Sequence, residues 1–171
     1  MIATALLKTQ HRKVEALFKK LESGRSDKAA VLEELADSLA AHMAIEHEFL
    51  YPAAKDVDDE MVNESFEEHS LAEFALKRLL ATDPEDEAFD ARVTALKELI
   101  EHHVEEEEEE LFPKVEKAID EDTLSSMGKA MKQRFDEVFE QGFAATVPRG
   151  MAKTSADVQK KKSTKRTKRA A

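Results

Sequence analysis

The sequence predicts an all-α protein, and three observations support this prediction. Glycine and proline, the residues that most disfavour a helix interior, number only four each in 171 residues. Ala, Leu, Glu and Lys, which lose little conformational freedom in a helix, recur throughout. Apolar residues recur at alternating steps of three and four in five segments, the spacing of one helix face. At 42% hydrophobic and 37% charged residues, the chain predicts one domain with a core between amphipathic helices.

We call the residues at these steps the inward row of each helix. The first helix ends before the Ser-Gly-Arg segment at 23–25, and its row is Leu7, His11, Val14, Phe18 and Leu21. The second begins after Ser26 and Asp27, which are typical helix caps. Its row is Leu32, Leu35, Leu39, His42, Glu46 and Phe49. Each of these two rows contains one histidine.

The third and fourth helices show the same pattern. The third follows the acidic segment 56–60 and ends before 82–86, with the row Val62, Phe66, His69, Glu73, Leu76 and Leu80. The row of the fourth is Val93, Leu96, Ile100, His103, Glu107 and Leu111. Four successive rows thus place one histidine each among apolar residues.

A fifth helix is predicted at about 123–141, and its row contains no histidine: Leu124, Met127, Met131, Phe135 and Val138. We interpret it as a packing element. From residue 148 onward the periodicity is lost, and repeated basic residues predict a disordered tail. Residues 149–171 carry a net charge of +8, against −19 for residues 1–148. The predicted division is a bundle at 1–120, the additional helix at 121–147 and the tail at 148–171.

The composition also excludes several kinds of site. The chain has no cysteine, so a metal ion would have to be held by nitrogen and oxygen ligands. No run approaches the ~18 to 20 apolar residues of a membrane span, and the first residues do not resemble a cleaved signal. We therefore expect a cytoplasmic protein that does not enter the membrane.

One eleven-residue pattern occurs twice. HMAIEHEFLYP at 42–52 and HVEEEEEELFP at 103–113 both read H-x-x-x-E-x-x-x-L-[YF]-P, and His11 and His69 precede them by 31 and 34 residues. The chain is therefore two similar helical hairpins. In each copy the histidine and the glutamate lie one turn apart on the same helix face.

The pattern selects one of the six consecutive glutamates at 105–110. Glu107 follows His103 by four residues and lies on the inward row, whereas Glu106 and Glu108 lie about 100° to either side. We predict that Glu107 is buried and that the other five are solvated. A buried carboxylate needs a cation or hydrogen-bond donors, because its burial otherwise costs several kcal/mol.

The alternative for each histidine is an ordinary core residue held by hydrogen bonds, but one histidine on each of four successive rows favours a metal site. His47 and His102 lie one residue off the rows, so we expect them at the surface or behind the ligands. Glu15 follows His11 by four residues, but Val14 competes for the inward position. Four histidines with two or three carboxylates exceed the needs of one ion and suit two bridged ions; Fe, Zn, Mn and Cu all remain open.

These residues resemble the hemerythrin-like (HHE cation-binding) family over about residues 3–115. The resemblance implies an up-down four-helix bundle around two non-haem iron ions. It implies Glu46 and Glu107 as bridging carboxylates and His11, His42, His69 and His103 as terminal ligands. The oxygen carriers of the family have a further histidine four residues after the third-helix histidine. Glu73 stands at that position here, and we predict it to be a buried anionic iron ligand.

The leading hypothesis is a di-iron protein that binds, senses or reacts with O2, NO or peroxide, or handles iron; whether it is an enzyme stays open. One alternative is a non-catalytic helical protein whose basic tail binds nucleic acid or an acidic partner. Another is a regulatory site with a single metal ion or with zinc.

Overall fold

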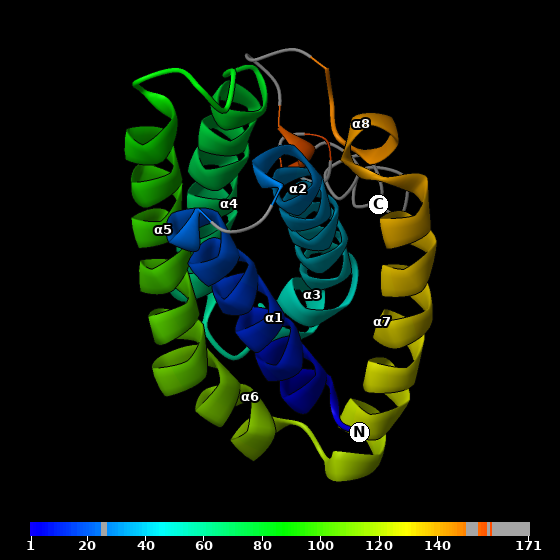
Figure 1. Cartoon of the computed structure of the whole chain (residues 1–171). Helices are drawn as coiled ribbons and strands as arrows, with labels where there is room; N and C mark the ends of the chain where they lie inside the picture. Colours follow the sequence, from blue (N-terminus) through cyan, green and yellow to red (C-terminus); the bar gives the residue numbers. More distant parts are fainter. Residues whose placement is uncertain (25–26, 150–153, 157, 159–171) are drawn as a thin grey trace.

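The computed structural model describes residues 1–24, 27–149, 154–156 and 158, and in this part of the chain every regular element is helical (Figure 1). The long helices are α1 (Ala3–Ser23), α2 (Lys28–Ile45), α4 (Asp59–Leu80), α5 (Phe89–Glu106) and α7 (Glu121–Gln141). The short helices are α3 (Tyr51–Ala54), α6 (Phe112–Ala118) and α8 (Phe143–Thr146). Helices α1 with α2 and α4 with α5 form the two predicted hairpins. The all-α four-helix bundle is confirmed.

Local sequence signals set the helix ends. Asp27 caps α2 by accepting from the backbone N–H groups of Ala29 and Ala30, as predicted. Asp58 and Asp120 cap α4 and α7 in the same way. Helix α1 ends at Gly24, whose φ of 63° is the left-handed conformation that glycine adopts at little cost.

Two short π-helical turns interrupt the second and fourth helices of the bundle. They are η1 (Glu46–Leu50) and η2 (Glu107–Leu111), and each begins at the glutamate of the repeated pattern. Each turn ends where the backbone N–H of Tyr51 or Phe112 bonds to the carbonyl of that glutamate, five residues back. A proline, which cannot donate to the helix ladder, follows immediately in both copies. π-turns of this kind are frequent at functional sites.

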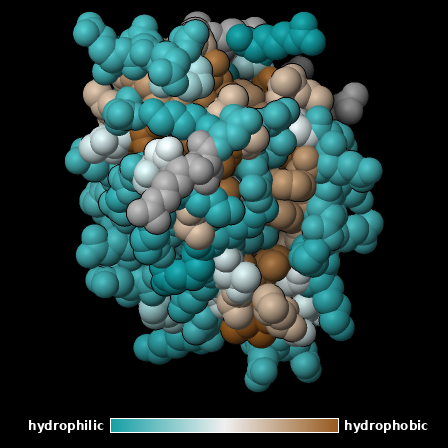
Figure 2. Space-filling model, in the orientation of Figure 1, coloured by the Kyte–Doolittle hydropathy of each residue, from teal (hydrophilic) through white to brown (hydrophobic). Residues whose placement is uncertain are grey.

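The inward rows form two apolar clusters at successive levels of the bundle. One cluster contains Val14, Phe18, Leu35, Leu76 and Leu96, and the other contains Leu7, Ile45, Leu50, Leu111 and Phe112. On α1, His11 lies between Leu7 of one cluster and Val14 of the other. The level of the histidines is therefore enclosed by apolar side chains from both sides, while the face seen in Figure 2 is mostly hydrophilic.

Helix α7 packs against α1 and α2 through its predicted row, of which Leu124, Met131 and Val138 are buried. Gly128 lies so close to the first residues that an added Cβ would be 2.5 Å from the carbonyl oxygen of Met1. Among the described residues no helix is both long and apolar enough to cross a membrane.

The expectation of a disordered tail from residue 148 is wrong for a short part of it. Thr154 and Ala156 are buried, and the backbone N–H of Ser155 donates to Glu73 of α4 at 2.9 Å. These residues pack because they are small and uncharged, unlike the basic residues after them. Residues 159–171, which hold most of the tail's basic residues, lie outside the described part of the chain.

Candidate metal centre

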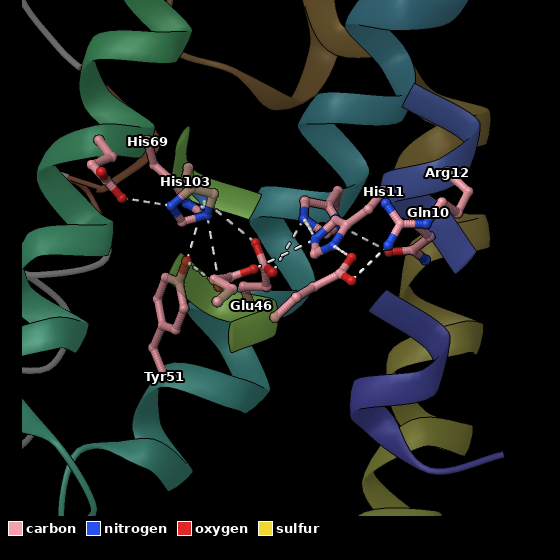
Figure 3. A network of polar contacts seen from close by, with 11 residues as sticks. Gln10, His11, Arg12, Glu46, Tyr51, His69 and His103 are labelled. Atoms are coloured by element: carbon pink, nitrogen blue, oxygen red, sulfur yellow. Dashed lines mark hydrogen bonds and ion pairs between the residues drawn. The ribbon is translucent and has the colours of Figure 1, made fainter. Parts of the chain in front are cut away.

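The four inward histidines meet in the middle of the bundle, each from a different long helix (Figure 3). All four are buried, with 3–4% of each residue exposed. The Nε2 atoms of His11 and His42 lie 3.2 Å apart, and those of His69 and His103 lie 2.9 Å apart. Each hairpin thus contributes one pair of imidazoles whose Nε2 atoms face each other.

The two glutamates of the repeat lie between these pairs. Glu46 has one carboxylate oxygen 3.1 Å from His42 Nε2 and the other 3.4 Å from His69 Nε2. Glu107 has one oxygen 3.5 Å from His11 Nε2 and the other 3.6 Å from His103 Nε2. Each carboxylate therefore faces one imidazole of each hairpin, which is the arrangement a bridging ligand requires.

Three carboxylate oxygens of this cluster are buried without a hydrogen bond: both of Glu46 and one of Glu107. Burying such atoms without a partner is costly in a protein interior, so these oxygens are suited to contact a cation. His11, His42, Glu46 and Glu107 bring ligand atoms within 4.8 Å of one another, and so do Glu46, His69 and His103. Glu46 belongs to both groups.

The outer nitrogen of every inward histidine is held by a further side chain. His11 Nδ1 donates to Glu108 at 2.8 Å, and His42 Nδ1 donates to Gln10 at 2.9 Å. In the other hairpin, His69 Nδ1 lies 2.8 Å from His47 Nε2, and His103 Nδ1 donates to Glu68 at 2.6 Å. Such contacts fix the ring so that Nε2 stays directed at the centre, as is usual for metal-ligating histidines.

These outer partners repeat with the pattern. Gln10 and Glu68 each precede the first histidine of a hairpin and hold its second histidine. His47 and Glu108 each follow the glutamate of a hairpin and hold the first histidine of the other one. The outer partners therefore occupy matching sequence positions in the two hairpins. The sequence could have indicated these outer partners, because each is the immediate neighbour of one of the repeated histidines or glutamates.

A comparison with protein families shows to which family the chain belongs. The model of the hemerythrin HHE cation binding domain family matches residues 2–115. The chain belongs to this family. A crystal structure of a hemerythrin HHE cation binding domain-containing protein from Mycobacterium kansasii is similar, with a TM-score of 0.74 and 24% identity. The alignment covers 82% of this chain and 89% of the other. A comparison with curated proteins found no significant match.

The prediction that Glu107 is the buried glutamate of the 105–110 run agrees with the structure, in which it is 1% exposed. The prediction that the other five are solvated is wrong for Glu108. Its side chain is 16% exposed and lies between His11 and Arg12. A regular α-helical register does not account for this position; Glu108 is the second residue of the π-turn η2.

Glu73 of this hemerythrin-like protein has polar partners other than the inward histidines. It is buried as predicted, but its oxygens contact Lys77 Nζ at 2.6 Å and the backbone N–H of Ser155 at 2.9 Å. It belongs to neither group of inward ligand atoms. The charge that compensates the buried carboxylate is the ammonium group one turn away, so a metal ion is not needed there.

The remaining candidates lie outside the centre. His47 is buried behind His69, whereas the side chain of His102 is 64% exposed and lies 3.5 Å from Glu106. Glu15 is paired with Lys19 at the surface. Burial raises the pKa of Glu106, and the nearby charge of Glu68 raises it further.

The charges of the inward histidines follow from their partners. Burial lowers the pKa of all four rings, and the nearby charges of other histidines, His11 for His42 and His103 for His69, lower the pKa of these two rings further. In His103 the charge of Glu107 and the hydrogen bond to Glu68 outweigh burial and raise the pKa to about 9. The pKa of His11 is raised similarly by Glu107 and Glu108. Without metal, the imidazolium ring of His103 therefore supplies positive charge at neutral pH.

The two hairpins differ at one aromatic position. Tyr51 donates its hydroxyl to Glu107 at 3.1 Å and lies 3.2 Å from His69 Nε2. Phe112 occupies the matching position of the second copy and stacks on His11. Burial and the charges of Glu107 and Glu46 raise the pKa of Tyr51, so the hydroxyl keeps its proton. The repeated sequence pattern accepts either tyrosine or phenylalanine at this position, so it did not distinguish Tyr51 from Phe112.

Proposed function

We propose that this chain holds two non-haem iron ions and uses them to bind, sense or react with O2, NO or peroxide, or to handle iron. The observation that supports this proposal best is the group of unpaired carboxylate oxygens of Glu46 and Glu107 among four Nε2 atoms. The membership of the chain in a cation-binding family points in the same direction.

In this proposal His11 and His42 bind one ion and His69 and His103 bind the other. Glu46 and Glu107 bridge them, since each carboxylate faces both pairs. Imidazole and carboxylate are ligands that iron accepts. Four histidines and two shared carboxylates leave each ion short of six ligands, so a small molecule can bind.

The bound iron would supply the redox chemistry, and the chain controls what surrounds it. The apolar clusters on both sides exclude water from the histidine level. The four outer partners hold the imidazole rings in place. The Tyr51 hydroxyl, which is protonated and directed at Glu107, is a proton donor beside the bridging carboxylate.

Anaerobic reconstitution with ferrous iron and elemental analysis test the ligand assignment. We expect two iron ions per chain, and we expect both His103→Ala and Glu107→Ala to lose iron and stability, because bound metal contributes to folding. Glu109→Ala, an exposed neighbour in the same run, is the matched control and should retain both ions. A single ion in the wild-type protein would contradict the dinuclear centre, as would equal iron content in all three variants.

Optical spectra of the reduced protein mixed separately with O2, NO and peroxide then test the reaction class. A new absorption band with at least one of these reagents supports ligand binding at the iron. If none of the three changes the spectrum while iron is taken up and released reversibly, iron handling is the remaining form of the proposal.

A further inference from the structure

A groove between α1 and α5 leads to the metal centre from the surface. Its volume is about 330 Å³, and its lining includes His11, one of the four inward histidines. Val14 and Phe18 of α1 and Ile100 and Val104 of α5 form an apolar wall. This wall has no ligand atoms, so an ion would not be retained before it reached the histidine.

The mouth of this groove is acidic. Glu15, Glu101, Glu105, Glu108 and Glu109 line it, against a single arginine, Arg12. Glu15 and Glu101 are partly compensated by Lys19 and Lys97. Within the part of the chain that the structure describes, Glu105 and Glu109 form no ion pair. The mouth therefore attracts cations and repels anions, and it belongs to a part of the chain with a net charge of −19.

One carboxylate connects the mouth with the centre. Glu108 contacts His11 Nδ1 with one oxygen and Arg12 with the other, the latter at 2.6 Å. The side chain of Arg12 is 61% exposed, so it can leave this contact without disturbing the core. Beyond His11 lie the unpaired oxygens of Glu46 and Glu107. Oxygen ligands thus follow one another from the surface to the centre.

From these contacts we infer that the groove between α1 and α5 is the entrance through which a divalent cation reaches the buried centre. Glu105 and Glu109 attract the ion, Glu108 passes it to the histidine level, and Arg12 restrains Glu108 when no ion is present. This inference rests on the proposed metal centre, but it concerns the rate of loading, whereas the proposed function concerns what is bound at equilibrium.

Stopped-flow uptake of Co²⁺ by the metal-free full-length protein tests the attraction, because tetrahedral or five-coordinate cobalt absorbs visible light and does not react with oxygen on this timescale. Glu105→Gln/Glu109→Gln should slow uptake at least about threefold at low salt and weaken its dependence on ionic strength. The final cobalt content should be unchanged. The matched control is Glu85→Gln/Glu87→Gln, which removes the same charge from exposed positions in the α4–α5 connection.

The width of the groove gives an independent test. Val104→Phe should narrow it and slow uptake, whereas Val104→Ala should widen it and speed uptake. Arg12→Gln should also speed uptake, because it removes a positive charge from the mouth and releases Glu108. Circular dichroism confirms folding, and final cobalt content confirms an intact centre in each variant.

The two proposals fail in different ways. Wild-type protein that binds no cobalt and no iron at equilibrium contradicts the metal centre and, with it, the entrance. Full binding at wild-type rates in the charge variant and both Val104 variants contradicts the entrance alone.

Discussion

Protonation of His103 links metal binding to pH. Its pKa of about 9 means that a proton occupies this ring at neutral pH in the metal-free protein, and a metal ion must displace it. The apparent metal affinity should therefore rise about tenfold for each pH unit up to about 9 and then level off. Competition with a chelator of known pH dependence measures this change. Affinity that stays constant between pH 7 and pH 9 would contradict a charged His103.

The same residue should make the metal-free fold sensitive to base. The folded-state pKa of His103 is raised above the ordinary value of 6.5, so its charge stabilises the fold fully below pH 6.5. That contribution is lost as the pH rises through about 9. Urea unfolding of the metal-free protein should show a falling free energy of unfolding from pH 6.5 to 9. In the metal-loaded protein the ring is held neutral by the ion, so this loss should be absent.

The buried Glu73–Lys77 pair gives a second prediction at the scale of single residues. Removing one partner of a buried ion pair leaves the other charge without compensation, so Lys77→Met should cost roughly 3 kcal/mol of unfolding free energy. Glu73→Gln/Lys77→Met should recover much of that loss. Both variants should retain their metal, because Glu73 contacts Lys77 and Ser155 instead of the histidines. Loss of an ion from the double variant would restore Glu73 as a ligand.

At the scale of elements, the π-turns η1 and η2 determine which residues reach the histidines. The extra residue in each turn accompanies the contacts that His47 and Glu108, one position beyond Glu46 and Glu107, make with His69 and His11. Deleting Glu109, an exposed residue of η2, should convert the turn to regular helix. We expect lower metal affinity and a lower melting temperature, because Glu108 would turn away from His11. Glu109→Gln keeps the turn and should behave as wild type; similar metal affinity in both variants would show that the turn has no such role.

The same turns mark the limit of what the sequence could predict. The inward rows selected His11, His42, His69, His103, Glu46 and Glu107, all of them buried, because a regular helix repeats every 3.6 residues and the pattern occurs twice. A π-turn breaks that period. The row therefore selected Phe49, which is half-buried, where the structure buries Leu50.

Long-range pairing explains the other differences. Lys77 follows Glu73 by four residues, which is an ordinary ion-pair spacing, but nothing in the local sequence reveals the second partner, Ser155, which lies 82 residues away. Periodicity shows which face of a helix is buried, but it does not show which polar groups meet on that face.

At the scale of the whole molecule, the two hairpins surround the centre with similar sets of outer partners. His11 and His42 have one carboxylate and one amide as outer partners, Glu108 and Gln10. The other pair has one carboxylate, Glu68, and one imidazole. Each half of the centre therefore has one carboxylate among its outer contacts. Helix α7 packs against the first hairpin, on α1 and α2, and contributes no side chain to either group of inward ligand atoms.

Beyond the difference between the Gln10 amide and the His47 imidazole, the hydroxyl of Tyr51 makes the two halves chemically unlike. It lies beside His69, while Phe112 presents only a ring face to His11. In the proposed di-iron centre the two nuclei should therefore sense different electric field gradients, and Mössbauer spectra should resolve two quadrupole doublets of equal area. Tyr51→Phe should bring the doublets together with iron content unchanged. One doublet in the wild-type protein would mean that the hydroxyl has no electronic effect and that the duplicated halves still behave as equals.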